Sequence, residues 1–250
     1  MSIEDIDKIS PASLELRRQF SETAQEAHNL HSHHNVAPTT NVKFSNPTAL
    51  AIGCFATTLT TLSLTLMEWR NVTITNAFAG NFFFAAGLGM VISAQWEMAL
   101  GNSFGYTVFS AFGFFYAGLG AINLPFFGVV DAYANNASEH NNALGFYVLM
   151  WAVFNIFFLV ASFRINVVYI GIFLTIELGF TLVAASYFAL ADGDIEIAIA
   201  TKKAGGAFCF VSGLLGWYTL AHLMCQESTF LTYPMGDTSR YFVHRSKKVS

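Results

Sequence analysis

The chain has 250 residues, of which 54% are hydrophobic and only 11% are charged, and its formal net charge is −4. Soluble domains usually carry about 25% charged residues, so this composition leaves too little polar surface to cover a globule in water. The modest acidic charge argues against a nucleic-acid partner. We therefore expect an all-α membrane protein, because the apolar runs are too long and continuous for a β-barrel.

The first 45 residues predict a polar, flexible tail (domain 1–45). The stretch "LELRRQFSETA" could form a short amphipathic helix, and four histidines follow it in a loose metal-like pattern: His28, His31, His33 and His34. No cysteine or carboxylate completes a ligand set, so we expect no metal site there. The tail lacks the basic start and short apolar core of a cleavable signal peptide.

Six apolar runs follow between residues 46 and 225, and they predict the membrane domain. A bilayer core of about 30 Å needs about 20 apolar residues per helix. We expect spans at about 48–68, 76–95, 103–123, 143–163, 166–190 and 204–225. Residues 226–250 predict a second polar tail.

Three cysteines lie in or near the apolar runs without CxxC spacing, so they are interpreted as buried hydrophobes: Cys54, Cys209 and Cys225.

The distribution of basic residues predicts the orientation. Six spans place both termini on one side, together with Lys43, Arg164, Arg240, Arg245, Lys247 and Lys248. The other side holds Arg70, Lys202 and Lys203, and acidic residues dilute the last two. The positive-inside rule then places both termini in the cytoplasm. Two glycosylation sequons, at Asn71 and Asn136, fall in the predicted outside loops, which agrees with this orientation.

The first span begins with "NPTALAIGCF". Asn46 is a natural N-cap residue, and Pro47 suits the first helical turn, where its missing N–H is not needed. The free N–H groups of a helix N-terminus also attract anions, so both a simple cap and a substrate site remain open for this motif.

The stretch "QWEMALGNSFG" joins the second and third spans. Asn102 is placed to cap the third helix, and Gly105 lets that helix pack closely. Glu97 lies near the C-terminal end of the second helix, where its charge opposes the helix dipole. This unfavourable position predicts a partner for Glu97 or a role at the mouth of a site.

Small residues recur in the second, third and sixth spans, for example "GLG" at 87–89 and "AGG" at 204–206. In lipid such residues let helix backbones approach closely. They are consistent with tight packing inside one subunit, with a subunit interface, or with a lining that leaves room for a solute.

Taken together, these motifs resemble the acetate uptake transporter family, which includes fungal acetate permeases, fungal ammonia-export proteins and bacterial succinate–acetate permeases. The family signature Asn-Pro-Ala-Pro-Leu-Gly-Leu, followed shortly by Gly-Phe, corresponds to "NPTALAIGCF", which keeps Asn46, Pro47, Leu50 and Phe55. Further matches are "WEMALGNSFGYTVFSAFG", "NNALGFYVLMWAVF" and "KKAGGAFCFVSGLLGWY". The resemblance covers about residues 44–225 in one order.

The resemblance implies a six-helix protomer that assembles into a homo-hexamer in the plasma membrane, with a solute path in each protomer. It implies transport of acetate and similar monocarboxylates, typically with protons, and it implies no cofactor; some fungal members are linked to ammonium release. The family's constriction positions fall on Phe55, Phe112 and Ile176. An apolar constriction resists hydrated ions by dewetting, yet it passes a small solute that sheds its water.

Several residues depart from the family pattern. Ala49, Ala51 and Met90 replace the usual Pro, Gly and Gln, and Glu177 replaces a small or apolar residue of the fifth span. A carboxylate near the bilayer midplane is costly and suggests a function, so Glu177 is a candidate proton or charge site. The alternative is a hydrogen bond to a neighbouring helix or subunit, because adjacent helix positions point about 100° apart.

Four other functions compete with acetate transport. Ammonia or ammonium export fits the family. An aquaporin-like channel would need a second Asn-Pro motif, which is absent from the sequence. A diverged permease that senses its solute with little flux is compatible with the departures above. A membrane enzyme is least favoured, because no nucleophile–base pair or metal cluster is evident.

Overall fold

The structure is a computed structural model, and it describes residues 15, 18–23, 45–134, 136–229, 231 and 233–242. Its internal contacts divide the chain into two units, Met1–Ser45 and Asn46–Ser250. In the first unit, residues 18–23 are helical, and Arg18 Nε lies 3.4 Å from Glu22 Oε1 one turn away. The four histidines of the predicted metal-like pattern lie outside the described residues.

The second unit consists of helices apart from a single bridge between Asn166 and Asp237, as far as its described residues go. The longer helices are α2 (Thr48–Leu66), η4 (Asn81–Met90), α3 (Val91–Ala99), α4 (Ser103–Asn123), α6 (Ala137–Ser162), α7 (Val167–Asp192) and α8 (Ile195–Ser228). Short helical turns connect them: η2 (Trp69–Asn71), η3 (Asn76–Phe78), η5 (Pro125–Phe127), α5 (Val129–Ala132) and η6 (Ser239–Phe242). In the described part of the chain, six helical segments are long and apolar enough to cross a membrane, which confirms the predicted number.

Two spans begin earlier than predicted. The fourth starts at Ala137 rather than at about residue 143, because Asn136 caps it: Asn136 Oδ1 accepts the Glu139 N–H, and Asn136 Nδ2 donates to Glu139 Oε2, both at 3.0 Å. The sixth starts at Ile195 rather than at about 204, two residues after Gly193, whose positive φ of 89° ends α7. Hydropathy locates the apolar part of a helix, whereas capping residues locate its end.

The second span is composite. It begins with η3, continues as the π-helix η4, and ends as α3. The buried residues Phe82, Ala86 and Met90 follow one another at intervals of four, which suits the wider turn of a π-helix. The inner face then continues into α3 through Ala94 and Glu97.

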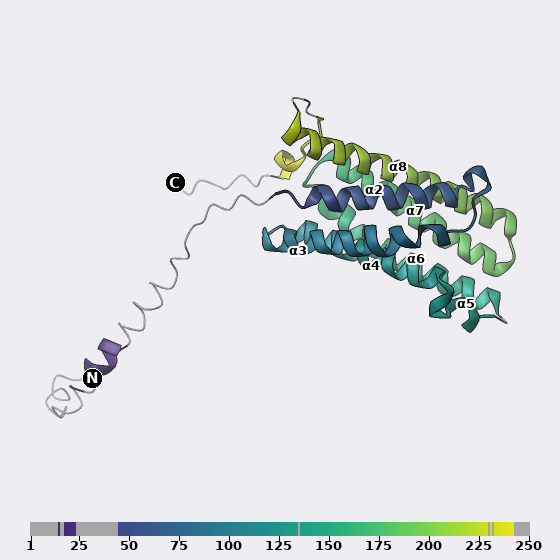
Figure 1. The fold of residues 1–250 in the computed structure, drawn as a ribbon, viewed down its shortest axis with the longest axis horizontal. Coiled ribbons are helices and arrows are strands. Elements are labelled where there is room, and N and C mark those ends of the chain that lie inside the picture. The colour runs from purple at the N-terminus through teal and green to yellow at the C-terminus, as the bar shows by residue number, and fades with distance from the viewer. Residues whose placement is uncertain are drawn as a thin grey trace. The chain divides into compact units, whose positions relative to one another are not determined.

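The long helices run side by side (Figure 1). Helix α7 packs between α6 and α8, α8 also packs on α2, and α2 packs on the second span, which packs on α4. Few backbone contacts join α4 to α6, and aromatic side chains fill that gap. Phe115 stacks on Tyr147 with ring centroids 6.0 Å apart, and Tyr147 Oη donates to the Phe115 carbonyl at 3.1 Å. The six spans therefore surround a central space.

The small residues of the sequence lie at helix–helix contacts inside this chain. A methyl group on Gly113 would lie 2.8 Å from Val91 Cγ2, and one on Gly205 would lie 3.0 Å from the Gly179 carbonyl oxygen. The first distance is shorter than real methyl contacts and the second is at the lower limit of them, so a larger residue would push the helices apart. The first of the three interpretations, tight packing within one subunit, is confirmed for these glycines.

The C-terminal residues that follow α8 return to the start of α7. The carbonyls of Met235 and Gly236 accept the N–H groups of Val168 and Val167, at 3.4 and 2.9 Å. Asn166 Oδ1 accepts the Tyr169 N–H at 2.8 Å. These acceptors satisfy N–H groups that the first turn of any helix leaves free.

Candidate functional site

A cavity of about 310 Å³ lies between α2, the second span, α4 and the start of α7. Its lining is largely apolar and aromatic: Ile52, Phe55, Met90, Phe104, Val108, Phe109, Phe112, Ile165, Ile172 and Phe173. Thr48, Asn102 and Tyr169 supply the polar side chains. Asn102 is exposed as well as lining the cavity, so the cavity reaches the protein surface at the end of the bundle where α2 begins.

Glu97 is buried directly behind this polar end, with 2% of its surface exposed. One of its carboxylate oxygens accepts the Thr48 hydroxyl, and the other accepts Asn102 Nδ2 at 2.7 Å. Asn102 Oδ1 in turn accepts the Gly105 N–H at 3.0 Å and caps α4, as predicted. A side chain on Gly105 would lie 2.6 Å from Asn102 Nδ2, so a larger residue at this position would displace the Asn102 side chain.

The position of Glu97 near the end of α3 is unfavourable for its charge, but the two partners of Glu97 compensate. Thr48 is the first residue of α2, and Asn102 is the N-cap of α4. The carboxylate therefore faces two helix N-termini, whose dipoles stabilise negative charge. The sequence predicted a partner for Glu97, and the structure shows two, Thr48 and Asn102, each at the start of a helix.

The other motif residues of the first span define where α2 begins. Asn46 Oδ1 accepts the Thr48 N–H at 3.0 Å, and the Ala51 N–H bonds the Pro47 carbonyl at 3.5 Å. Leu50 is 56% exposed and borders a groove on the outer surface rather than the cavity. Of the four motif residues that match the family signature, Phe55 lines the cavity, whereas Asn46, Pro47 and Leu50 do not.

Two of the three predicted constriction residues meet at the inner end of this cavity. The rings of Phe55 on α2 and Phe112 on α4 contact each other edge to face, with centroids 6.1 Å apart. Phe112 also contacts Phe158 of α6 and Phe180 of α7, at 6.0 and 6.4 Å. Aromatic side chains from four helices therefore close the cavity at this level.

A second, smaller cavity of about 80 Å³ lies beyond these rings. On three helices a residue of the larger cavity is followed by one of the smaller: Phe55 and Leu59 on α2, Phe112 and Phe115 on α4, Phe173 and Phe180 on α7. Ile176, the third predicted constriction residue, lies between Phe173 and Phe180 and is 1% exposed. Phe55, Phe112 and Ile176 therefore lie at the boundary between the two cavities, and their role as a constriction stays a prediction.

Glu177 points away from these cavities. Its Oε2 accepts Asn155 Nδ2 of α6 at 2.9 Å, and the same nitrogen donates to the Phe173 carbonyl at 2.9 Å. Glu177 lines neither of the two cavities, although it follows Ile176 directly in the sequence. The structure thus shows the hydrogen bond to a neighbouring helix that the sequence left as the alternative.

Three residues that contribute to this region were not singled out from the sequence: Thr48, Asn155 and Tyr169. Thr48 replaces the Ala of the family signature, and that difference was an available signal. Asn155 is a polar residue inside an apolar span, and such residues usually bond across helices. Tyr169 offered no signal, because aromatic residues are common throughout this chain.

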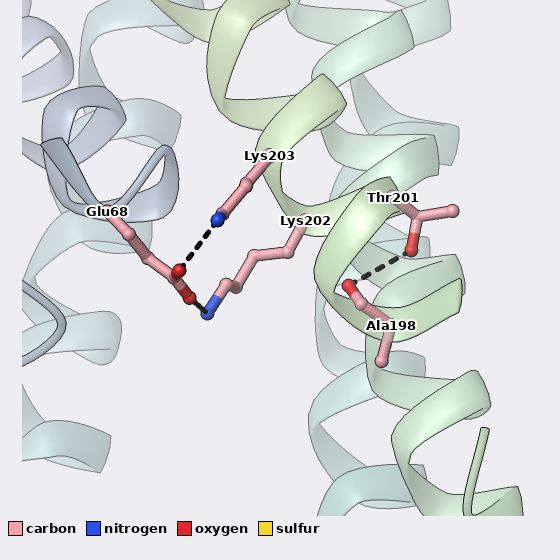
Figure 2. A network of polar contacts seen from close by, with 5 residues as sticks. All are labelled: Glu68, Ala198, Thr201, Lys202 and Lys203. Carbon is pink, nitrogen blue, oxygen red and sulfur yellow. Dashed lines mark hydrogen bonds and ion pairs between the residues drawn. The ribbon is translucent and has the colours of Figure 1, made fainter. Parts of the chain in front are cut away.

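A charged cluster lies at the opposite end of the bundle (Figure 2). Glu68, which follows α2, accepts Lys202 Nζ at 2.7 Å and Lys203 Nζ at 2.8 Å. The hydrogen bonds from Lys202 and then Lys203 lower the pKa of Glu68 from 4.5 to about 2. Glu68, Arg70 and Asn71 have positive φ angles of 56°, 54° and 62°, which asparagine tolerates but which are strained for Glu68 and Arg70. The ion pairs fix this strained turn against α8.

Six apolar helices, four of which line a cavity that aromatic rings close at its inner end, define a polytopic membrane protein with an internal site for a small solute. The chain belongs to the GPR1/FUN34/yaaH family, whose sequence profile matches residues 28–238. The family membership predicted from the motifs is confirmed.

Several relatives have been named for transport. The chain is 50% identical over 206 residues to acetate transporter protein patA of Penicillium expansum, covering 82% of this chain and 83% of that one. It is 53% identical over 197 residues to patA of Aspergillus clavatus, covering 79% and 80%. Ammonia transport outward protein 2 of Saccharomyces cerevisiae is 34% identical over 183 residues, covering 73% of this chain and 62% of that protein.

A solved structure has the same fold. The bacterial acetate channel SatP superposes with a TM-score of 0.64 at 26% sequence identity, and the match covers 78% of this chain and 100% of that chain. The likeness therefore extends over the whole of that channel and over most of this chain.

Proposed function

We propose that this chain transports acetate and other small monocarboxylates across a membrane, through the two cavities and the constriction between them. Relatives of about 50% identity are named acetate transporters, and a protein of the same fold is an acetate channel. The larger cavity, about 310 Å³, is about ten times the 30 Å³ that a water molecule occupies in the liquid, so it has room for a solute of the size of acetic acid together with water.

One observation carries this proposal: an apolar boundary made by Phe55, Phe112 and Ile176 separates two cavities on the same bundle axis. Such a boundary excludes hydrated ions, because a narrow apolar passage does not stay filled with water. A small solute that sheds its water can cross it. A core that served packing alone would need neither of the two cavities.

The test is substitution at the constriction. Purified Phe112→Ala protein in lipid vesicles is expected to raise uptake of a larger acid, labelled benzoate, relative to acetate by about tenfold, since the pocket gains several methylene volumes. Phe114→Ala is the matched control, because Phe114 lies on the same helix and is 61% exposed on its outer side. An equal benzoate-to-acetate ratio in both variants would contradict a path through this boundary.

Flux also separates transport from sensing. Wild-type protein should carry labelled acetate faster than protein-free vesicles of the same lipid. Specific binding of acetate without such flux would favour the membrane-sensor alternative.

We also propose the finer features implied by the charge distribution and the family resemblance. Both termini face the cytoplasm, the protein lies in the plasma membrane, six protomers form the assembly, and protons accompany the solute. Residues 1–45 and 226–250 flank the transporter domain. Protease protection in sealed membranes tests the orientation, and the mass of the purified protein in a mild detergent tests the hexamer.

Ammonium remains the second candidate solute, because one relative is named for ammonia transport.

The proton- or charge-site role of Glu177 also stays a prediction. Its hydrogen bond to Asn155 supports the alternative, in which Glu177 acts on the path only by joining α7 to α6 beside the constriction.

A further inference from the structure

The polar end of the larger cavity offers both hydrogen-bond donors and acceptors to a ligand. Thr48 donates its hydroxyl proton to Glu97, so the remaining lone pairs of its oxygen are free to accept. Asn102 uses its oxygen and one N–H within the protein and retains one N–H. The Tyr169 hydroxyl has no hydrogen-bond partner among the described residues, while the ring is held by Phe104 and Phe173 at 6.5 and 6.4 Å.

The charged side chain beside this end, among the described residues, is the acidic Glu97. No cationic side chain lines the cavity in the described part of the chain. Among the described residues, the titratable groups at its polar end are Glu97 from α3, which bonds two lining residues, and Tyr169 from α7, which lines the cavity. The starts of α2 and α4 would attract an anion, but the Glu97 carboxylate already occupies that position.

We propose that the cavity binds the undissociated acid, with Tyr169 donating to its carbonyl, Thr48 accepting its hydroxyl, and Glu97 excluding the carboxylate anion. The inference rests on the proposed function and specifies which form of the substrate the same site takes. Tyr169, Thr48 and Glu97 are then specificity-determining residues.

A neutral acid suits both parts of the site. It presents one O–H donor and one carbonyl acceptor, which the free groups of Thr48 and Tyr169 complement. Its transfer from water to the apolar boundary at Phe55 and Phe112 also costs far less free energy than the transfer of a carboxylate. An ammonium cation fits less well, because Glu97 lies behind the lining and both of its oxygens already accept hydrogen bonds.

Acetamide is a neutral isostere of acetic acid and serves as the probe. Unlabelled acetamide should inhibit labelled acetate uptake by wild-type proteoliposomes, with an inhibition constant that stays the same between pH 5.5 and 7.5. The apparent KM for total acetate should rise about tenfold per pH unit over that range, because the undissociated fraction falls by that factor. Absence of acetamide inhibition, or stronger inhibition by methylammonium, would overturn the proposal.

Membrane potential gives an independent readout. Uptake of a neutral species should not change when a potassium gradient with valinomycin makes the vesicle interior negative. Glu97→Gln keeps an acceptor for Asn102 and removes the charge, so uptake by this variant should become sensitive to the potential. Glu196→Gln, which changes an exposed carboxylate of α8, is the control and should behave as wild type.

Tyr169→Phe should raise the KM for acetate and the inhibition constant of acetamide together, by about fivefold, the equivalent of one hydrogen bond. Tyr106→Phe is the control, since Tyr106 does not line the cavity. Wild-type uptake that follows the anion concentration and the potential would refute this inference while leaving acetate transport intact. Uptake no faster than in protein-free vesicles would instead refute the proposed function itself.

Discussion

Glu97 is a buried carboxylate whose two hydrogen-bond partners stand at the starts of two different helices. Through Thr48 and Asn102 it joins the first turn of α2 to the first turn of α4. Removing the carboxylate would leave buried donors without an acceptor, which typically costs about 1–3 kcal/mol. The same residue therefore serves both the packing of three helices and the charge at the cavity.

At the residue scale, the pair formed by Glu177 and Asn155 can be separated into its charge and its hydrogen bond. Glu177→Gln keeps an acceptor for Asn155, so we expect less than a twofold change in uptake of acetate and methylammonium. Asn155→Ala leaves the Glu177 carboxyl and the Phe173 carbonyl without their donor, and it should lower the free energy of unfolding by about 1–3 kcal/mol. Thermal unfolding in detergent measures the second effect.

A change of more than fivefold in the rate or pH profile of Glu177→Gln, at matched protein amounts, would favour the proton- or charge-site role instead.

The ion pairs of Glu68 predict a specific pH dependence. Because Lys202 and Lys203 lower its pKa from 4.5 to about 2, the stability they contribute is complete above pH 4.5 and is lost as the pH falls toward 2. The difference in melting temperature between wild type and Glu68→Gln should be constant from pH 5.5 to 7.5 and should shrink below about pH 4.5. A difference that already disappears between pH 7.5 and 5.5 would contradict this account.

Residue patterns predicted part of the site. The capping role of Asn102 and the need of Glu97 for a partner followed from helix ends, which obey local rules. The roles of Thr48 and Tyr169 could not be predicted in this way, because they arise where α2, α3, α4 and α7 converge. The direction of Glu177 depended on the rotation of α7 about its axis, which hydropathy alone does not determine.

At the element scale, α7 and α8 pack through small residues. Gly205→Leu should disrupt this contact, because a methyl group alone would lie 2.9 Å from Val183 Cγ2 and 3.0 Å from the Gly179 carbonyl oxygen. Overpacking of this kind costs about 1–3 kcal/mol, so the melting temperature should fall. Gly80→Leu, where the added methyl group would meet nothing within 4 Å, is the control. Equal melting temperatures for the two variants would contradict close packing at Gly205.

The sequence predicted the number of spans, but it did not predict all of their ends or their internal form. Residues 195–203 interrupt their apolar side chains with Glu196, Lys202 and Lys203, yet they continue α8, because Ala, Glu and Lys are good helix formers. The π-helix from Asn81 to Met90 has no established sequence signal, since it depends on packing against α2 and α4. Hydropathy indicates whether a segment lies in lipid or in water. Capping and packing determine where its helix ends and which type of helix it forms.

At the scale of the whole molecule, the helix order around the bundle determines what the cavity can contain. Backbone contacts run from α6 through α7, α8, α2 and the second span to α4, and aromatic rings complete the circuit. The cavity between α2, α4 and α7 thus combines residues from opposite ends of the sequence. The local pattern of any one segment therefore cannot predict which residues line this cavity.

The most direct measurement of the central claim is acetate uptake by purified protein whose larger cavity has been filled. Ile172 lines that cavity and Leu174, on the same helix, is 46% exposed on the outer surface. We predict that Ile172→Trp lowers labelled acetate uptake into proteoliposomes at least about tenfold, whereas Leu174→Trp leaves it near the wild-type rate. The melting temperatures of both variants should stay close to that of the wild type, which shows that both proteins are folded. Uptake by folded Ile172→Trp protein at the wild-type rate would contradict a path through this cavity.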